Sequence, residues 1–484
     1  MLLTIAMSAS MYGARAVGIS EQDLLNQFGG AVLTHNAALF VGAGMSRVAA
    51  PDSPDWAKLV EPLRRRVHIP ADLEDLPLVA QYFVQHPDGN RQQLEEHVAN
   101  ELSSVRPSRL VGHERLAALP ISEVWTTNYD WFLEEVMPTA QVVVRDEDLA
   151  DRRTAWDRRI IKMHGGLDGR GGWAAPPVIT RADYERYEST HQRMWAALTA
   201  TFLTRSFLFL GFSFSDPNVD VLLRLARSRF EFGGPEHFTV FRRPDSDADR
   251  KLFPHRVRDL QLSGVAVLEI DDHAQLIPLL GRLVRRTRPP RLFVSGSGRG
   301  IGDVCDRLGR RLVDLGVEVA SLAGDAGMGV SYSLGRAMRD QSRYDPNRVM
   351  LLFRQKEEPP PELTERTGTV VYSHLPAEQL RRSAIDSSRA LVVVGGGETT
   401  ASEVAIADEL GVPVVPIGTA GGTGRVVWQR LSTGLGSLTI GGAPVNAEDF
   451  ALLGNADAAV AVESAVRLLT QAMYLGIQTV PGHR

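Results

Sequence analysis

The stretch ALFVGAGMSRVAAPDSPDWAKL, residues 38–59, begins as an apolar strand, breaks at Gly42, Ala43 and Gly44, and reaches Ser46 as a helix is expected to begin. A strand that ends in Gly-x-Gly lets backbone amides approach a phosphate closely, and the N-terminus of the following helix adds electrostatic attraction. Glycine also serves ordinary turns, so this stretch alone favours neither a nucleotide site nor a simple turn. The residues at the ends of the other predicted strands are needed to distinguish a nucleotide site from a simple turn.

Short apolar runs alternate with longer amphipathic stretches along the chain, which is typical of parallel strands buried beneath helices. A basic, proline-containing segment, GRLVRRTRPPR at 281–291, interrupts this alternation and is interpreted as a linker. We therefore predict an α/β protein with two Rossmann-like parallel-sheet domains, residues 1–285 and 286–484. The expected strands lie within 37–44, 121–130, 159–165, 206–213, 237–241 and 265–270, and then within 291–298, 317–324, 348–354, 369–373, 390–397 and 412–418.

Composition excludes several classes of function. The chain has 484 residues, enough for two domains, and its net charge of −5 gives no electrostatic reason to bind nucleic acid. The opening MLLTIAMSAS lacks a basic region, and no segment approaches the roughly 20 apolar residues of a membrane span, so we expect a cytoplasmic protein. The single cysteine, Cys305, excludes an intrachain disulfide and any zinc site that needs two cysteines.

Polar residues follow several other strands of the first domain. TTNYD supplies Asn128 and Asp130, KMHG supplies His164, and GFSFSDPN supplies Gly211 and Ser213. Ligands of open α/β sheets bind beyond the carboxyl ends of the strands, so we expect these residues to gather around one site. An amide and an imidazole there could position and deprotonate a water molecule, although a strand-end cap and a core histidine remain alternative interpretations.

These motifs and their order resemble the sirtuin superfamily over about residues 25–280. The resemblance implies that Asn128 and Asp130 lie beside the nicotinamide ribose of NAD and that His164 is the general base. It also implies that the pyrophosphate and the neighbouring ribose are held by Gly42, Ala43, Gly44 and Ser46. The adenosine side of NAD would lie beside Gly211 and Ser213.

One departure from the sirtuin pattern decides which reaction we expect. Protein-deacetylating sirtuins carry a zinc module of four cysteines, and this chain has only one cysteine. The segment after the glycine turn also differs, as APDSPDWAKLV replaces the extended Phe-Arg segment of the deacetylases. We therefore expect NAD to be a substrate that is hydrolysed to nicotinamide and ADP-ribose, with water as the acceptor and no metal.

The second domain carries glycine-rich turns of its own. FVSGSG contains Ser295 and Gly296, and ALVVVGGGETTASEV contains Gly396 and, on the following helix, Glu403. These turns resemble the SLOG superfamily, which is related to the Lonely-Guy phosphoribohydrolases, over about residues 290–480. The resemblance implies a signal-binding pocket in which Arg381 or Arg382 holds a phosphate and Glu403 accepts hydrogen bonds from a ribose. A structural role for the glycines, and a solvated position for Glu403, remain alternatives.

The combination of the two domains resembles ThsA, the effector family of Thoeris antiphage defence. The resemblance implies a homo-oligomeric NAD hydrolase, activated allosterically when its SLOG domain binds a cyclic ADP-ribose isomer made by a TIR-domain partner protein. Two other functions stay open. One is a Lonely-Guy-like phosphoribohydrolase with an NAD-sensing domain, and the other is a non-catalytic NAD-binding module.

Overall fold

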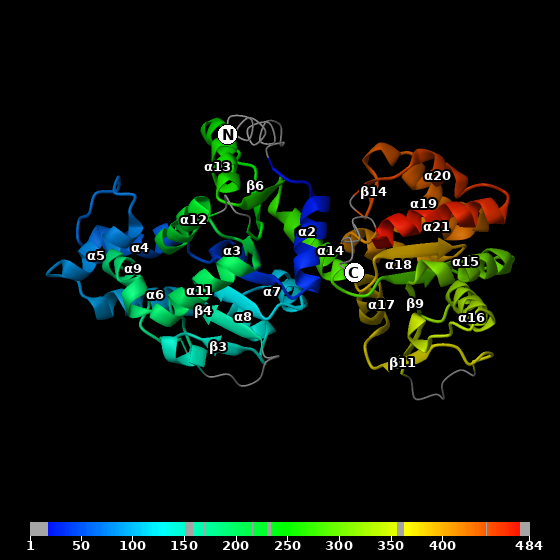
Figure 1. Cartoon of the computed structure of the whole chain (residues 1–484), viewed down its shortest axis with the longest axis horizontal. Coiled ribbons are helices and arrows are strands. Elements are labelled where there is room, and N and C mark those ends of the chain that lie inside the picture. The colour runs from blue at the N-terminus through cyan, green and yellow to red at the C-terminus, as the bar shows by residue number, and fades with distance from the viewer. Residues whose placement is uncertain are drawn as a thin grey trace, which may run out of the picture. The chain divides into compact units, whose positions relative to one another are not determined.

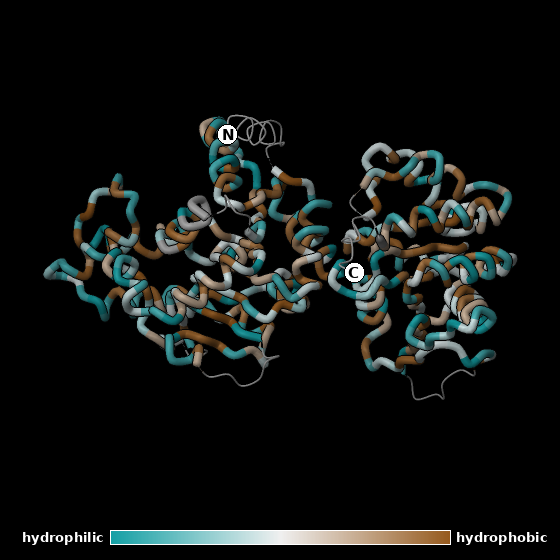
Figure 2. Tube along the Cα trace, in the orientation of Figure 1, coloured by the Kyte–Doolittle hydropathy of each residue, from teal (hydrophilic) through white to brown (hydrophobic). Residues whose placement is uncertain are grey.

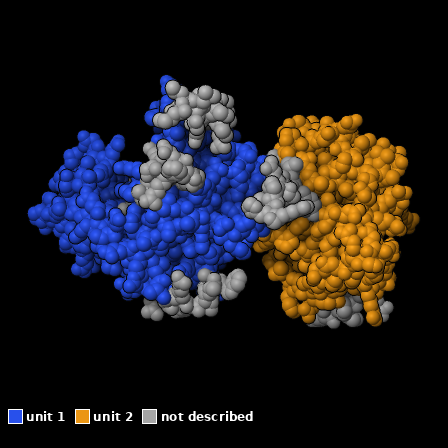
Figure 3. Space-filling view, viewed as in Figure 1, with its two compact units in different colours: residues 1–280 blue, residues 281–484 orange. Residues whose placement is uncertain are grey.

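We describe the protein from a computed structural model, for residues 18–150, 158–168, 171–214, 216–229, 234–355, 363–441 and 443–474. The opening stretch MLLTIAMSAS lies outside these residues. The chain divides into two compact units, Met1–Leu280 and Gly281–Arg484 (Figure 3). The predicted boundary after residue 285 falls within one helix, Leu276–Arg286, and stays a prediction.

Unit 1, which contains the labelled strands β3, β4 and β6 in Figure 1, is built on a seven-stranded parallel sheet. The strand order is β3-β4-β2-β1-β5-β6-β7. Its strands are β1 (Ala37–Val41), β2 (Glu123–Thr126), β3 (Gln141–Val143), β4 (Arg159–Lys162), β5 (Ser206–Leu210), β6 (His237–Arg242) and β7 (Val265–Ile270). Its helices are α2 (Glu21–Leu33), α3 (Ala43–Ala49), α4 (Trp56–Arg66), α5 (Leu76–Gln85), α6 (Arg91–Ser103), α7 (Val111–Ala117), α8 (Phe132–Val136), α9 (Arg181–Glu185), α10 (Tyr187–Thr190), α11 (Gln192–Thr204), α12 (Pro217–Arg229) and α13 (Asp247–Leu262), followed by α14 (Leu276–Arg286), which the unit boundary divides.

Strand β1 occupies the point where the strand order reverses. Its five residues, AALFV, are all buried, as expected for a strand covered on both faces. The chain leaves β1 for β2 on one side and later returns to pair β5 with the other side of β1. Ligands of open α/β sheets bind at such a switch point, beyond the carboxyl ends of the strands.

Unit 2 has a six-stranded parallel sheet with the order β11-β10-β9-β8-β12-β13, and its switch point lies between β8 and β12. The strands are β8 (Arg291–Ser295), β9 (Glu318–Ser321), β10 (Val349–Arg354), β11 (Thr369–Ser373), β12 (Ala390–Val394) and β13 (Val414–Ile417), with a small antiparallel pair β14 (Thr439–Ile440) and β15 (Ala443–Pro444). The helices are α15 (Gly302–Leu315), α16 (Asp325–Asp340), α17 (Ala377–Asp386), α18 (Glu398–Leu410), α19 (Gly422–Ser432), α20 (Ala447–Leu452) and α21 (Ala458–Tyr474).

The two parallel sheets confirm the predicted α/β class with two Rossmann-like domains. Hydrophobic segments, brown in Figure 2, run through each unit. All residues of strands β1 and β12 are buried. Within the described residues, no helix has the length and apolar character that a membrane span requires.

A buried histidine lies at the start of β6. His237 is fully buried, and its ring stacks on Phe202 with the ring centroids 4.0 Å apart. Its Nδ1 accepts a hydrogen bond from the backbone amide of Phe207 at 3.2 Å, which requires an unprotonated nitrogen. Burial lowers the pKa of His237 to about 3, so the imidazole is neutral in the folded protein at neutral pH.

We expect His237 to make the stability of the fold sensitive to acid. Below pH 6.5 the unfolded chain binds a proton that the folded chain excludes, so stability present above pH 6.5 is lost as the pH falls towards about 3. Within that window we expect His237 to lower the free energy of unfolding by about 1.4 kcal/mol per pH unit. Urea unfolding at about pH 7 and about pH 5 should show a shallower pH dependence for His237→Asn, which keeps an acceptor for Phe207. Equal pH slopes in the variant and the wild type would contradict this.

Candidate active site

Three side chains at the ends of β1 and β2 form a hydrogen-bonded chain. Asn128 Nδ2 donates to Ser46 Oγ at 3.0 Å, and Ser46 Oγ donates to Asp130 Oδ2 at 2.7 Å. Asn128 is 8% exposed and Ser46 is 2% exposed. The structure therefore brings Ser46 to Asn128 and Asp130, which follow it by 82 and 84 positions along the chain.

Thr126 fixes the turn that carries Asn128. Its hydroxyl donates to the carbonyl of Val41 at 2.8 Å and accepts from the backbone amide of Asn128 at 2.9 Å. The side chain thus links the last residue of β1 to the turn after β2. TTNYD was selected for its asparagine and aspartate, and the structural contribution of its first threonine was missed.

The glycines of the β1 turn allow it to contact the β5 turn closely. The amides of Gly42 and Gly44 donate to the carbonyls of Leu210 and Gly211, each at 2.8 Å. A Cβ atom on Gly44 would lie 2.6 Å from Gly211 Cα, and one on Gly211 would lie 2.3 Å from the amide nitrogen of Met45. Both glycine amides are therefore engaged by β5, and a direct contact of these amides with a phosphate stays a prediction.

We expect Gly211→Ala to destabilise unit 1 by about 3 kcal/mol, from the left-handed backbone and the clash of Cβ with backbone atoms. Gly211 has φ +64°, and its neighbours are main-chain atoms that cannot rotate away. Gly30→Ala is the matched control, because Gly30 lies inside α2 with nothing within 4 Å of an added Cβ. Denaturant unfolding should show that this control is neutral or stabilised by up to about 1 kcal/mol. Similar stability in both variants would contradict the argument.

His164 follows β4 and is 2% exposed. Its ring packs edge-on against Tyr184, with the centroids 5.1 Å apart, and its Nε2 lies 3.5 Å from Asp216 Oδ2. Burial lowers the pKa of His164, although Asp216 works in the opposite direction. The imidazole is therefore neutral at neutral pH and able to accept a proton, and a nearby carboxylate can stabilise the imidazolium that results.

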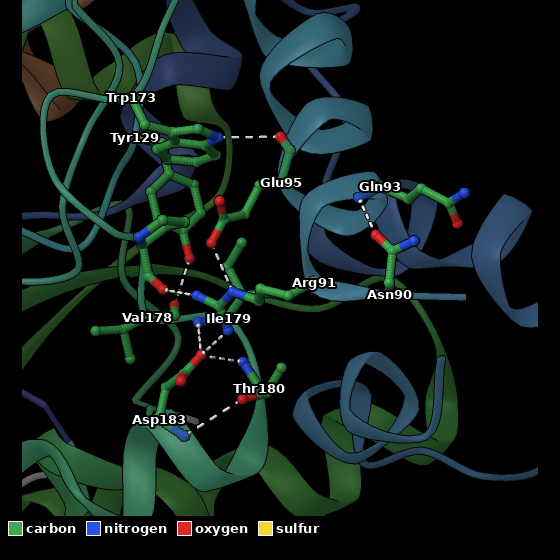
Figure 4. Close-up of polar contacts among 11 residues, drawn as sticks. Asn90, Arg91, Gln93, Glu95, Tyr129, Trp173, Val178, Ile179, Thr180 and Asp183 are labelled. Carbon is green, nitrogen blue, oxygen red and sulfur yellow. Dashed lines mark hydrogen bonds and ion pairs between the residues drawn. The ribbon is translucent and has the colours of Figure 1, made fainter. Parts of the chain in front are cut away.

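A segment at residues 173–183, which we call the strap, lies against both His164 and the Asn128 turn. The backbone amide of Val178 donates to the carbonyl of His164 at 3.1 Å. The Tyr129 hydroxyl donates to the carbonyl of Val178 at 2.6 Å, as Figure 4 shows. Tyr129 is the central residue of the Asn128–Asp130 turn. The strap therefore joins the two strand ends that carry Asn128 and His164.

Arg91, at the start of α6, holds the strap in place (Figure 4). Its guanidinium contacts Asp183 Oδ2 at 2.5 Å and Glu95 Oε1 at 2.6 Å, and it also donates to the carbonyl of Pro177. Burial acts to raise the pKa of the Asp183 carboxyl, but the hydrogen bonds from Arg91 and from the backbone amides of Thr180 and Ile179 outweigh it and lower that pKa. The carboxylate stays ionised and keeps the ion pair closed.

The side chain of Ser213 is exposed, unlike the buried side chains of Asn128 and His164. Its carbonyl accepts a hydrogen bond from Arg256, whose guanidinium lies 5.1 Å from the centroid of the Phe241 ring. The structure thus fixes the backbone at Ser213, and the predicted role of this residue on the adenosine side stays a prediction.

In unit 2, three predicted residues meet at the switch point. Ser295, the last residue of β8, donates a hydrogen bond to Glu403 Oε2, and Arg381 Nε lies 3.5 Å from Glu403 Oε1. Burial raises the pKa of the Glu403 carboxyl, against the opposing effects of Ser295 and Arg381. Arg382 instead pairs with Glu409 on the exposed side of α18. Of the two candidate arginines, Arg381 is the one that the structure brings to the Ser295–Glu403 pair.

The predicted glycines of this site are required by close backbone contacts. Gly296 has φ +138°, and a Cβ atom there would lie 1.9 Å from the carbonyl oxygen of Val394. Gly396 has φ +102°, and its amide donates to the carbonyl of Ser297 at 2.7 Å. The turns after β8 and β12 are therefore packed directly against each other.

No group of three or more His, Cys, Asp or Glu side chains that could hold a metal ion occurs in the part of the chain that the structure describes. Cys305 is buried, and burial raises the pKa of its thiol to about 11. A buried neutral thiol is a poor metal ligand and a poor nucleophile.

The fold and the strand-end residues together define an α/β protein with a SIR2-like domain and a second parallel-sheet domain. The family model described as a SIR2-like domain matches residues 122–260, which include Asn128, Asp130, His164, Gly211 and Ser213. Several curated relatives carry the name NAD(+) hydrolase ThsA. The chain is ThsA-like.

The ThsA of Acinetobacter baumannii (strain 532279) is 28% identical over 434 residues, covering 82% of this chain and 87% of that protein. The ThsA of Enterococcus faecium is 27% identical over 461 residues, covering 85% and 91%. The ThsA of Bacillus cereus (strain MSX-D12) is 32% identical over 283 residues, covering 55% of this chain and 57% of that protein. A solved structure, that of TM1055, covers 33% of this chain and 88% of its own, with 23% identity and a TM-score of 0.25.

Proposed function

We propose that the chain is an NAD hydrolase and that unit 1 cleaves the bond between nicotinamide and ribose. The observation that carries this proposal is the hydrogen-bonded chain of Asn128, Ser46 and Asp130 at the switch point, joined through the strap to a buried, neutral His164. The names of the ThsA relatives, NAD(+) hydrolase, agree with it.

The proposed chemistry follows from these side chains. When the bond between C1′ and the nicotinamide nitrogen breaks, its electron pair leaves with nicotinamide and the ribose acquires oxocarbenium character. Asn128 Nδ2 is engaged by Ser46, so its amide oxygen is the atom that can orient a water molecule. As water attacks C1′, its proton passes to His164 and then to solvent, giving nicotinamide, ADP-ribose and one proton.

We assign the acceptor role to water because the chain has one cysteine and cannot build the four-cysteine module of the deacetylases. The remaining predicted residues, Gly42, Ala43, Gly44, Gly211 and Ser213, would line the pyrophosphate and adenosine parts of the substrate. No metal takes part in this scheme.

Unit 2 is proposed to be the regulatory domain, which binds a cyclic ADP-ribose isomer supplied by a TIR-domain partner. The support is a buried serine–glutamate pair at the switch point with the partly exposed Arg381 beside it, where Arg381 can hold a phosphate and Glu403 can accept from a ribose hydroxyl. An allosteric coupling free energy of roughly 1 to 3 kcal/mol between the two sites would mean that a ligand bound at one site changes the affinity of the other site about 5- to 150-fold. In this proposal the protein is a cytoplasmic, homo-oligomeric antiphage effector.

Incubation of the purified chain with NAD, with and without cyclic ADP-ribose isomers, tests the proposal against its alternatives. We expect NAD to disappear with release of nicotinamide, and faster with one of the isomers. Release of free adenine would instead favour a phosphoribohydrolase in unit 2. Saturable NAD binding without consumption under every condition would favour a non-catalytic binding module.

A further inference from the structure

A buried lysine lies between the two halves of the proposed catalytic site. Lys162 is the last residue of β4, two positions before His164, and is 1% exposed. It is paired across the sheet with Thr126, the residue that caps the Asn128 turn. Burying an ammonium group is costly unless each of its protons finds an acceptor. The acceptors of Lys162 therefore indicate what the lysine does.

The three acceptors of the Lys162 ammonium group all belong to the segment that follows Asn128. Its Nζ donates to Glu134 Oε1 at 2.7 Å, to the carbonyl of Tyr129 at 3.3 Å, and to the carbonyl of Asp130. An ammonium group has three donors, so this set satisfies it. One side chain on the His164 strand thus binds two consecutive carbonyls of the turn whose side chains are Asn128, Tyr129 and Asp130.

The second glycine after His164 makes room for this lysine. A Cβ atom on Gly166 would lie 2.3 Å from Lys162 Cε and 2.7 Å from its Nζ. The chain therefore passes close over the lysine immediately after His164. The Asn128–Asp130 turn has a second connection to His164: the Tyr129 hydroxyl donates to the carbonyl of Val178, and the Val178 amide donates to the carbonyl of His164.

We infer that Lys162 is a positioning residue for the reaction, which sets the place of the Asn128–Asp130 turn relative to His164. The inference rests on the proposed NAD hydrolysis. A lysine suits the position better than an apolar residue because the carbonyls of Tyr129 and Asp130 would otherwise lose a hydrogen-bond donor in the protein interior, and an unsatisfied buried acceptor is costly. Lys162 does not contact the reacting atoms in this scheme, so its loss changes the geometry of the site and not its chemical groups.

The test uses the full chain with Lys162→Met and the double variant Lys162→Met/Glu134→Gln. The double variant removes both charges, so no unpaired carboxylate is left beside the gap and the fold is retained more readily. A misplacement of about 1 Å can cost about 100-fold in rate, so we expect kcat for nicotinamide release to fall about 100-fold while KM for NAD changes less than about 3-fold. Lys251→Met, at an exposed lysine of α13, is the matched control and should keep wild-type kinetics.

Amide hydrogen exchange provides a second readout that does not depend on activity. We expect residues 128–134 to exchange faster in the double variant, with α2 and unit 2 unchanged, because the turn loses its anchor. Wild-type kcat together with wild-type exchange at 128–134 in the folded double variant would overturn the inference. If exchange at 128–134 becomes faster in the double variant but the wild-type protein consumes no NAD, the role of Lys162 in holding the turn is supported and the proposed function is contradicted.

Discussion

Asn128→Ala and His164→Ala are each expected to lower kcat for nicotinamide release by about 1,000-fold. Asn128 would no longer orient the water molecule, and without His164 no neutral imidazole would remain to accept its proton. Both variants should still bind NAD, because the glycine turns and the strap do not depend on these two side chains. Product release is measured by chromatography, and NAD binding by calorimetry.

Matched substitutions distinguish loss of chemistry from loss of fold. Asn90 caps the N-terminus of α6, since its Oδ1 accepts a hydrogen bond from the amide of Gln93 at 2.9 Å (Figure 4). Asn90→Ala should lower the free energy of unfolding by about 1 kcal/mol without changing kcat. His255→Ala changes an exposed histidine of α13 and should behave as wild type. Wild-type rates in folded Asn128→Ala or His164→Ala would remove that residue from the proposed mechanism.

The second large effect is expected in unit 2. Arg381→Ala should weaken binding of the activating cyclic ADP-ribose isomer by about 10- to 100-fold, since a hydrogen bond to a charged group contributes about 1.5 to 3 kcal/mol. Activation of NAD hydrolysis should then require correspondingly more signal, while the rate without signal stays as in the wild type. Calorimetry gives the binding constant, and nicotinamide release at increasing signal concentration gives the activation curve.

Arg382→Ala is the control for this experiment, because its guanidinium pairs with Glu409 and not with Glu403. It should bind the signal and respond to it as the wild type does. Impaired signalling in Arg382→Ala with normal signalling in Arg381→Ala would contradict the assignment of the pocket to the Ser295–Glu403 side of α18.

Most of the fold was predictable because most of its strands are buried on both faces and therefore form short, continuous apolar runs. AALFV at β1 and ALVVV at β12 are such runs, and both are fully buried. Strand β3 was missed, since its three residues, Gln141–Val143, lie at the sheet edge and include one buried side chain only. A strand this short gives too little periodicity to be recognised.

The meeting of the candidate site residues was predictable where polar residues follow apolar strands, and unpredictable where it depends on tertiary contacts; their catalytic roles stay predictions. Polar residues after apolar strands pointed to Asn128, Asp130 and His164. No local pattern revealed that the Gly44 amide would donate a hydrogen bond to the carbonyl of Gly211. Nor did any pattern reveal that Arg381, and not Arg382, would lie beside Glu403. Both contacts depend on how segments distant in the sequence pack together. The lysine in RIIKMHG was a visible signal that went unused, since a charged residue in a buried strand needs partners.

The proposed NAD hydrolysis is tested most directly by a product analysis of NAD turnover by the wild-type chain, in the presence of a metal chelator and an acetyl-lysine peptide. We expect nicotinamide and ADP-ribose in equal amounts, an unchanged peptide, and no loss of rate from the chelator. Persistence of NAD at every signal tested, or transfer of the acetyl group to ADP-ribose, would contradict it.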